Sequence, residues 1–512
     1  MSKISLSPNA SGTGTFTIQS PAGNTNRTFT LPDADGELSV GGGGGSNDFV
    51  ASGSIPNGDA VGLNSDGTVS VIKTPLVDSE TIDSSSSFTS TDVKAAINPT
   101  TGDIVVVYSD SSNSYQGYAV VGSVNNDTIT FGSPVGFQAD NDGIGAVATA
   151  IGFDSASSKF LIFWAARASY NAGRAVVGTV SGSTISFGSR VNFGGTTVLK
   201  DYIDLAFDTN NNKFLVTYDG GDNGYRSATA RVATISGTSV SFGSETAIDV
   251  NLNNTTTTTC SFDPVSGKFL VYYRRHNAYG RLRVGTISGT SVSFGTEITF
   301  GNEAVTTDRV SYFRAASDGT NLVGVYRRDG GAGTRAALFT ISGTSVTFGT
   351  ETTITSSPAD TFTLIYNSSL DTFLISGIYT SSIAVKEVKL SNGVFFPKAT
   401  STLIDSSTSY HQAVYDPTSG HVISAARGPS NYNPVVSVYN PETNLNNFIG
   451  FSEAAISDGD TGSITTLGGI NESQTGLIAG FNYYLQDDGS LGSTESDNFA
   501  GLAISSTKLI KL

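Results

Sequence analysis

The sequence predicts an all-β protein: a seven-bladed β-propeller of four-stranded blades, inserted in a small β domain and preceded by an N-terminal β segment. Three observations predict this fold. Charged residues make up 14% of the chain and glycine 59 of its 512 residues, which suits strands and tight turns better than helix surfaces. Two hairpin patterns alternate with a repeat of roughly 54 residues. One outer strand is missing after the last repeat, and a matching segment stands before the first.

The first hairpin pattern reads VGTISGTSVSFG and ends in a Phe-Gly pair. The pair recurs at Phe131, Phe187, Phe242, Phe294 and Phe348, and a diverged sixth copy begins at Val388. The Ser-Gly-Thr between its two halves supplies the glycine of a tight turn. Each copy therefore predicts the third and fourth strands of one blade.

The second pattern precedes each copy of the first and reads FDPVSGKFLV. It occurs seven times, starting at Ile97, Phe153, Phe207, Phe262, Ala316, Tyr366 and Tyr415. Each copy has an Asp or Asn whose side chain can cap its own turn, followed by a β-branched run. These copies predict the first and second strands, so a repeat holds four antiparallel strands, as a propeller blade does.

The count of strands predicts how the ring closes. The last copy ends near Asn440 with no outer strand after it, whereas VDSETID, at 77–83, matches the tail of an outer strand. We expect 77–83 to complete the last blade and to close a propeller over 76–440, which hides the edges of an open sheet.

The segments outside the ring have a simpler pattern. Residues 1–40 alternate polar and apolar residues and predict a β segment that attaches the chain to its partners, and a glycine-rich linker at 41–46 follows. Residues 47–75 and 441–512 share short strands and Asp-Gly turns and predict the two parts of one small β domain. The last strand is predicted to run from Gly501 to Leu512.

Composition excludes several classes of function. The formal charge of −16 disfavours nucleic acid as a partner, and a lone Cys260 excludes a disulfide framework and Cys-cluster metal sites. The chain has no run of 18 apolar residues, so we expect no membrane insertion. Met1 is not followed by the apolar core of a secretory signal.

Several stretches together carry a family resemblance. Residues 14–38 (GTFTIQSPAGNTNRTFTLPDADGEL), GDAVGLNSDGTVSVI from Gly58, NYYLQDDGSLGSTE from Asn482 and the propeller repeat resemble tail-fibre and appendage proteins of marine tailed bacteriophages. The resemblance implies a virion protein made in the host cytoplasm, a homotrimer attached to tail or neck proteins through 1–40, with the propeller presented to a host-surface glycan or outer-membrane component. It brings no catalytic residues. A purely structural virion protein, such as a collar fibre or capsid decoration, is the first alternative, and a polysaccharide depolymerase is the second.

One face of the predicted ring carries the longer loops, those between the second and third strands and between blades, and we expect recognition there. Tyrosines recur in these loops, and their rings suit the flat faces of sugars, although ordinary packing at blade edges is the alternative. The candidates are Tyr115, Tyr118, Tyr170, Tyr225 and Tyr279.

Arginines cluster in the fourth and fifth blades. Nine of the 28 basic residues lie within 272–335, beside five acidic ones. Arg274, Arg275, Arg327 and Arg328 end equivalent strands, where planar guanidinium groups would suit a phosphate or carboxylate of a glycan. Salt bridges at the blade edges are the alternative interpretation.

Signals for catalysis and for metals are weak. His276, His411 and His421 have no motif context, and no GxSxG, P-loop or HExxH string occurs. We therefore expect no enzymatic activity, no catalytic residue and no cofactor. Calcium is the metal that Asp140–Gly143 and Asp487–Gly489 would suit, but Asp, Asn and Gly are also ordinary turn residues, so no metal site is predicted.

Overall fold

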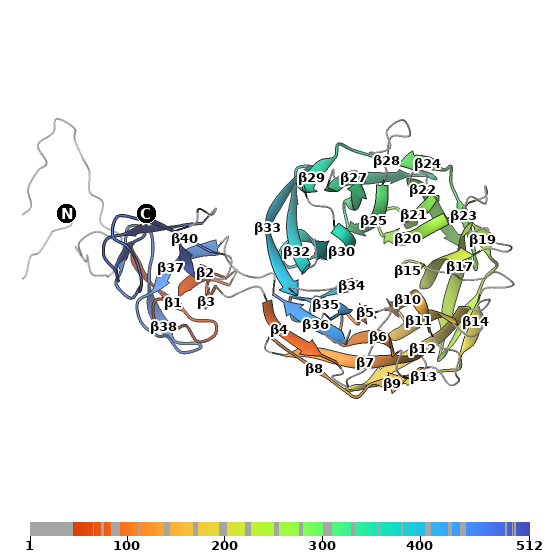
Figure 1. Cartoon of the computed structure of the whole chain (residues 1–512), viewed down its shortest axis with the longest axis horizontal. Helices are drawn as coiled ribbons and strands as arrows, with labels where there is room; N and C mark the ends of the chain where they lie inside the picture. The colour runs from red at the N-terminus through yellow and green to blue at the C-terminus, as the bar shows by residue number, and fades with distance from the viewer. Residues whose placement is uncertain are drawn as a thin grey trace, which may run out of the picture.

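The computed structural model shows a ring of β-sheets beside a smaller β region (Figure 1). All its regular elements, among the residues that the structure describes, are β-strands, and no helix there is long and apolar enough to cross a membrane. The structure describes residues 45–64, 66–72, 76–82, 93–110, 113, 115–125, 127–137, 144–166, 173–193, 202–220, 227–249, 255–275, 280–300, 310–328, 333–356, 359–379, 382–404, 411–428, 433–440, 447–486, 489–493, 495 and 498–512. The predicted segment 1–40 and most of the linker lie outside these residues. The all-β class and the repeated β-propeller architecture are confirmed.

Seven of the described sheets share one plan, in which strands succeed one another from the centre of the ring outward. All neighbouring strands in them are antiparallel. The first three are β5 (Val93–Ile97), β6 (Ile104–Asp110), β7 (Gln116–Asn125), β8 (Thr128–Phe131) and β9 (Val135–Gly136); β10 (Ile144–Asp154), β11 (Lys159–Ala166), β12 (Gly173–Ser181), β13 (Thr184–Phe187) and β14 (Val191–Phe193); and β15 (Ile203–Asp208), β16 (Lys213–Gly220), β17 (Ser227–Ser236), β18 (Ser239–Phe242) and β19 (Thr246–Ala247).

The other four sheets continue the ring. They are β20 (Thr255–Asp263), β21 (Lys268–Arg275), β22 (Gly280–Ser288), β23 (Ser291–Phe294) and β24 (Ile298–Phe300); β25 (Val310–Ser317), β26 (Leu322–Arg328), β27 (Thr334–Ser342), β28 (Ser345–Phe348) and β29 (Thr352–Thr355); β30 (Ala359–Asn367), β31 (Thr372–Tyr379), β32 (Ser382–Ser391) and β33 (Val394–Ile404); and β34 (His411–Asp416), β35 (His421–Arg427), β36 (Pro434–Tyr439) and β4 (Leu76–Thr81).

The turn between the first and second strands of each sheet is held by an Asp or Asn side chain. Its carboxylate or amide oxygen accepts a hydrogen bond from the backbone N–H two residues on, at 2.7–3.2 Å. The seven capping residues are Asn98, Asp154, Asp208, Asp263, Asp318, Asn367 and Asp416. This satisfied turn is why the sequence signal recurs in every repeat.

The glycine of the Phe-Gly pair lets neighbouring sheets approach closely. A Cβ atom on Gly243 would lie 1.6 Å from the backbone oxygen of Thr290, in the hairpin of the next sheet, and Gly132, Gly188 and Gly295 meet equivalent oxygens at 1.8–1.9 Å. At this glycine the outer strand breaks, so β18 and β19 pair separately with β17, where the sequence predicts one strand. The glycine-free β33 runs unbroken.

A separate cluster of buried apolar side chains fills each seam between neighbouring sheets. In one seam, Phe163 of β11 packs with Phe214 and Val216 of β16. The seam between the last and the first sheet is of the same kind and joins Ile423 of β35 to Tyr108 of β6. Burial of such a side chain stabilises the fold by about 1.5–3 kcal/mol, so this seam stabilises the fold as the others do.

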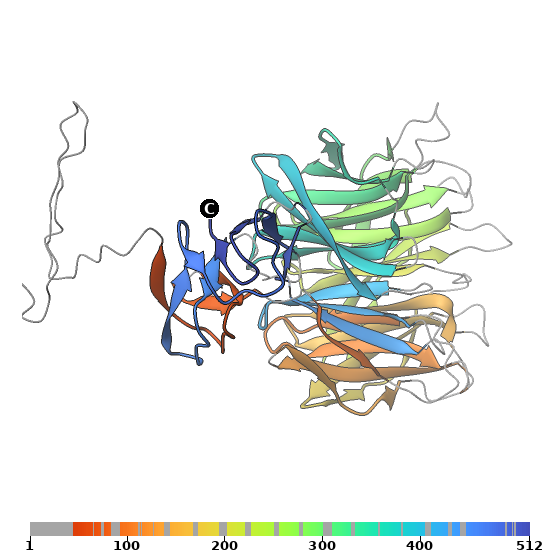
Figure 2. The same ribbon diagram turned by 60° about the vertical axis from the view of Figure 1, so that its left-hand side comes forward.

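The last sheet takes its outermost strand from the beginning of the ring. β4 pairs antiparallel with β36, with Leu76 opposite Tyr439 and Thr81 opposite Val435. Asp78 also accepts a hydrogen bond from the Ile129 N–H of β8, at 2.8 Å, and His421 Nε2 lies 2.8 Å from Asp127 Oδ1 across the same seam. The chain therefore enters and leaves the ring on one face, the face of the short turns (Figure 2).

The smaller region contains two sheets. The first combines strands that precede the ring in the sequence with strands that follow it. Its order is β1 (Ser46–Val50), β38 (Thr461–Thr465), β37 (Phe448–Ser452), β2 (Ala60–Leu63) and β3 (Val69–Val71). The second contains β39 (Ile470–Asn471), β43 (Leu509–Ile510), β42 (Phe499–Ala503), β40 (Asn482–Leu485) and β41 (Leu491–Gly492). The single strand predicted for 501–512 is wrong, because a turn over Ser505–Thr507 divides it into β42 and β43.

Candidate functional site

Two of the four arginines that the sequence singled out, on the second strands of their sheets, belong to ion pairs away from the axis of the ring. Arg275 donates from Nε and Nη2 to the two carboxylate oxygens of Asp249, at 2.9 and 2.8 Å, and from Nη2 to Glu297 at 2.8 Å. Arg328 donates to both oxygens of Glu351. Arg275 and Arg328 are thus engaged by carboxylates, as the salt-bridge alternative holds, because neighbouring strands bring an acid to each guanidinium. We place the candidate site elsewhere.

The other predicted residues that the structure describes are spread over separate sheets. Arg274 and Arg327 are half-buried, each one residue before an ion-paired arginine and so on the opposite face of its strand. Tyr118 accepts a hydrogen bond from Asn113 and stacks on Tyr108 with ring centroids 5.8 Å apart, whereas Tyr115 is half-exposed with a left-handed backbone, φ 60°. Tyr170, Tyr225 and Tyr279 lie outside the described residues, so they stay predictions, as does any role of Arg274, Arg327 and Tyr115.

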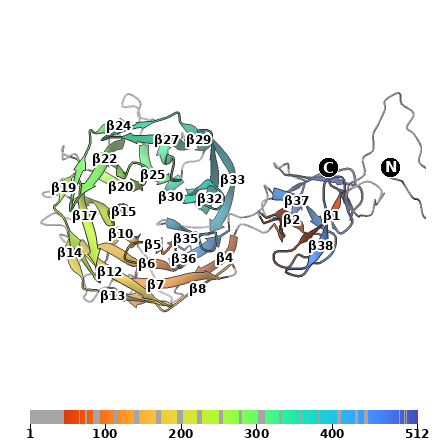
Figure 3. The same cartoon turned by 180° about the vertical axis from the view of Figure 1, so that it is seen from behind.

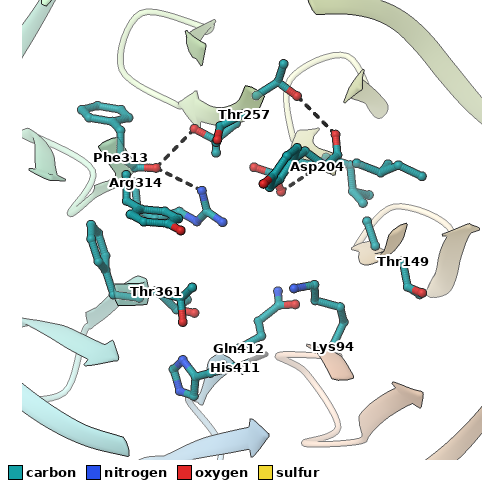
Figure 4. Close-up of a pocket in the computed structure, with 18 of the residues that line it drawn as sticks. Lys94, Thr149, Asp204, Thr257, Phe313, Arg314, Thr361, His411 and Gln412 are labelled. Atoms are coloured by element: carbon teal, nitrogen blue, oxygen red, sulfur yellow. Dashed lines mark hydrogen bonds between the residues drawn. The ribbon is translucent and has the colours of Figure 1, made fainter. Parts of the chain in front are cut away.

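A polar cavity with a volume of about 310 Å³ lies on the axis of the ring (Figure 4). It is lined by the innermost strands of all seven sheets, and each of these strands contacts the next, including β34 with β5. Viewed from behind, the same strands surround the axis (Figure 3). Its volume falls at the lower end of the range for small-ligand sites, about 300–1,000 Å³.

One position of the repeat supplies the charged side chains of this cavity. It lies four residues before the capping Asp or Asn, so that the seven sheets present one residue each at the same level of the channel. The residues at this position are Lys94, Ala150, Asp204, Thr259, Arg314, Thr363 and Gln412. The scaffold is therefore repetitive, while its axial side chains differ from sheet to sheet.

Asp204 and Arg314 face the cavity from different sheets without forming an ion pair with each other. Asp204 accepts hydrogen bonds from the backbone N–H groups of Leu205 and Cys260, at 3.0 and 3.1 Å. Burial raises the pKa of Asp204 from its usual value, and the positive charges of Arg314 and Lys94 oppose that rise. The carboxylate is thus held in place by backbone donors and lies in the field of two cations.

The Arg314 guanidinium reaches towards the open centre of the ring (Figure 4). Its Nη1 donates to the backbone oxygen of Phe313 at 3.0 Å, a contact that fixes the side chain and uses one of five N–H donors. Lys94 and Gln412 come from the adjoining strands β5 and β34. Donor groups therefore line one side of the channel, and Asp204 lies on a sheet between β5 and β25.

Two tyrosines each stand two residues before the repeat position that holds Asp204 and Arg314, and so lie nearer the start of the inner strand. Tyr202 is 38% exposed with a left-handed backbone, φ 68°, a conformation that costs a non-glycine residue about 1–2 kcal/mol. Tyr312 is half-buried on β25. Because the inner strands start on the face opposite the short turns, these rings mark the end of the channel that faces away from the two chain connections.

His411 closes part of the wall between β31 and β35. Its Nε2 lies 2.9 Å from Ser376 Oγ and 3.0 Å from Ser424 Oγ, and its side chain is buried. Burial, with a smaller contribution from Lys94, lowers the pKa of His411 from 6.5 to about 3. The imidazole is therefore neutral at physiological pH, so the charges that line the described cavity are those of Lys94, Asp204 and Arg314.

The described residues contain no group of three or more His, Cys, Asp or Glu side chains placed to hold a metal ion. The two turns considered for calcium fall almost wholly outside the described part, with Gly489 alone inside it.

The channel residues were not predicted from the sequence. A signal was present: in an inner strand of mostly apolar and Thr residues, Lys94, Asp204, Arg314 and Gln412 occupy the same repeat position. The arginines of 272–335 were predicted instead, because their high density along the chain can be seen without aligning the repeats.

Comparison with known proteins yields likeness of fold alone. No protein-family model and no curated protein matches the chain. A solved structure from Bacteroides fragilis, described as "a putative 6-phosphogluconolactonase", is 11% identical, covers 72% of this chain and 99% of its own, and has a TM-score of 0.45. One from Bacteroides uniformis with the same description is 13% identical, with coverages of 71% and 100% and a TM-score of 0.42. A Lactobacillus plantarum protein is 13% identical, with coverages of 60% and 83% and a TM-score of 0.43.

These neighbours correct one expectation from the sequence. We expected no enzymatic activity, but two proteins of similar fold are described as putative enzymes. The expectation of no enzymatic activity is therefore corrected, while the depolymerase alternative from the sequence had left a hydrolytic activity open. At 11–13% identity the likeness assigns no reaction to this chain.

Proposed function

We propose that the protein is a virion appendage protein whose propeller binds a saccharide of the host cell surface through the axial cavity. In this proposal the seven repeated sheets are the seven blades of a closed ring, and residues 1–40 attach the chain to other copies of itself and to tail or neck proteins. The resemblance of several segments to phage tail-fibre proteins motivates the appendage role.

The observation that carries the binding function is the composition of the cavity wall. Threonine hydroxyls, a glutamine amide, one carboxylate and two cationic groups converge on a space of about 310 Å³, and two tyrosines lie at one end. Sugars are recognised by such sets, since hydroxyl groups pair with planar polar side chains and the apolar ring face packs on an aromatic ring.

The position of the two tyrosines supports the same function. They lie at the end of the channel opposite the face where the chain enters and leaves the ring. A protein anchored through its smaller region would therefore present this end outward, towards a cell surface.

The test is binding of the full chain to purified surface polysaccharides and to whole cells of a susceptible host. We expect adsorption that Tyr312→Ala weakens about 2–13-fold, the effect of losing one aromatic contact of about 0.5–1.5 kcal/mol. Tyr366→Ala, which removes a tyrosine near the short-turn face that bonds Asp371, is the matched control and should leave adsorption unchanged.

Two results would contradict the proposal. Antibodies that label the capsid or neck and leave adsorption intact would assign the structural alternative. Binding that is equal in Tyr312→Ala and the parent would place recognition outside the channel. Release of reducing ends from a bound polysaccharide would add a hydrolytic activity to the binding function.

A further inference from the structure

The charges of the axial cavity do not cancel. Lys94 and Arg314 contribute two positive charges and Asp204 one negative charge, and no other charged side chain lines the described cavity. The net charge of the cavity is thus one positive, in a chain whose formal charge is −16. A ligand with one negative charge matches this balance of lining charges.

The orientation of the groups distinguishes the two ends of that ligand. Arg314 is anchored through Nη1 on Phe313 and faces the centre, so a fork of N–H donors is directed at the cavity and matches the two oxygens of a carboxylate. Asp204 is a pure acceptor that is already fixed by two backbone N–H groups, and it suits a hydroxyl donor. The wall thus suits a ligand that has an acidic group at one end, against Arg314, and hydroxyl groups at the other, against Asp204.

The hydroxyl-bearing wall adds to this requirement. Thr259 donates to the backbone oxygen of Phe313 at 3.3 Å, and Thr363 accepts from the Ala413 N–H at 3.2 Å. Both hydroxyl groups bridge neighbouring inner strands and are held in position at the same level as Arg314. A polyhydroxylated ligand finds several fixed polar groups there, each with hydrogen-bonding capacity beyond the one bond that holds it in place.

We propose that the axial cavity takes a sugar acid with a single carboxylate, such as the hexuronic acid residue that ends a glycan chain, with its carboxylate on Arg314 and its hydroxyl groups on Asp204 and the threonines. The inference rests on the saccharide-binding function proposed above and names the chemical class of the saccharide. A volume of about 310 Å³ limits the enclosed part to a terminal residue, while Tyr202 and Tyr312 lie where the rest of the glycan would leave.

The experiment compares four probes on the full chain by titration calorimetry at pH 7: D-glucuronate, D-galacturonate, D-glucose and glucose 6-phosphate. We expect at least one of the two uronates to bind about tenfold or more tightly than glucose, since a charge-assisted bidentate contact is about twice as strong as a neutral one. Glucose 6-phosphate, with about two negative charges, should bind more weakly than that uronate.

Three variants test the assignment of roles. Arg314→Gln should remove the preference for uronate over glucose, while Lys389→Gln removes the same charge from an exposed position outside the cavity and should retain it. Asp204→Asn raises the net charge of the site by one and should shift the preference towards glucose 6-phosphate by about tenfold. If Asp204→Asn does not fold, Arg314→Lys provides the second test. This variant keeps the positive charge but loses the pair of guanidinium N–H donors, and it should lower uronate affinity.

The outcomes separate this inference from the function on which it rests. Glucose or a neutral glycan binding as tightly as both uronates would overturn the inference and leave saccharide binding intact, as would an Arg314→Gln variant with unchanged uronate preference. Failure to bind every monosaccharide and every host polysaccharide would overturn both.

Discussion

The outer edge and the axis of this ring use the same kinds of residue in opposite ways. At the edge, carboxylates beside the outer strands engage Arg275 and Arg328 of the second strands, and glycines recur where one sheet meets the next. At the axis, Arg314 and Asp204 share the cavity wall without an ion pair, and the equivalent position holds a different residue in most sheets. Repetition at the edge builds the scaffold, whereas variation at the axis is where a ligand can be specified.

The largest expected effect tests whether the outer arginines are structural. Arg275→Gln leaves the buried carboxylate of Asp249 without its partner, and the loss of one member of a buried pair costs about 3–5 kcal/mol. We expect the free energy of unfolding to fall by that amount in urea titrations, with uronate affinity unchanged under native conditions. An Arg275→Gln/Asp249→Asn double variant should regain part of the loss, and a stable Arg275→Gln variant that no longer binds saccharide would reverse the comparison.

A second prediction concerns His411 at the axis. The pKa of His411 in the folded protein, about 3, lies below the ordinary 6.5. Between pH 6.5 and pH 3 the unfolded chain therefore binds a proton that the folded chain does not bind. Stability therefore falls as the pH drops through this window, by at most about 1.4 kcal/mol per pH unit. Because Asp204 titrates with the opposite sign, the measurement is the difference between the parent and His411→Asn in urea titrations from pH 7 to 4.5.

That difference should shrink by about 2–3 kcal/mol between pH 6.5 and 4.5. A constant difference would mean that His411 is protonated in the folded protein as readily as in the unfolded chain, and that the wall between β31 and β35 admits a charge. His421→Asn is the comparison variant. It changes the histidine that pairs with Asp127 across the seam between the last and the first sheet.

The smallest expected effect concerns the glycines at the edge. Gly243→Ala forces the Thr290 hairpin to move, because a Cβ atom would lie 1.6 Å from its backbone oxygen, and such overpacking costs about 1–3 kcal/mol. Gly349→Ala is the matched control, since its nearest neighbouring atom is at 3.8 Å. Equal melting temperatures for the two variants would show that sheet spacing is not set by this glycine.

These contrasts explain how much of the molecule could be predicted. The capped turns at residues such as Asp154 and the Phe-Gly pairs satisfy local requirements that repeat in each sheet, so the all-β class and the propeller architecture were accessible from the sequence. The break of the outer strand at Gly243 was not, because it depends on the backbone of the next sheet.

The candidate site was less accessible. Lys94, Asp204 and Arg314 lie far apart along the chain and meet through the radial arrangement of the sheets, so no local pattern joins them. The arginines near 275 and 328 were conspicuous because they are dense in sequence, yet the acids that engage them come from neighbouring strands. Position within the repeat, rather than local density, was the informative property.

The pairing of β4 with β36 has a consequence for synthesis of the chain. Residues 76–81 leave the ribosome roughly 350 residues before their partner strand, a delay of about 20–70 s at 5–20 residues per second. During that time the strand must remain unpaired in a crowded cell, and its Asp78 and Glu80 carry charges that discourage pairing with other chains. The nascent protein thus has to protect β4 until its last repeat is made.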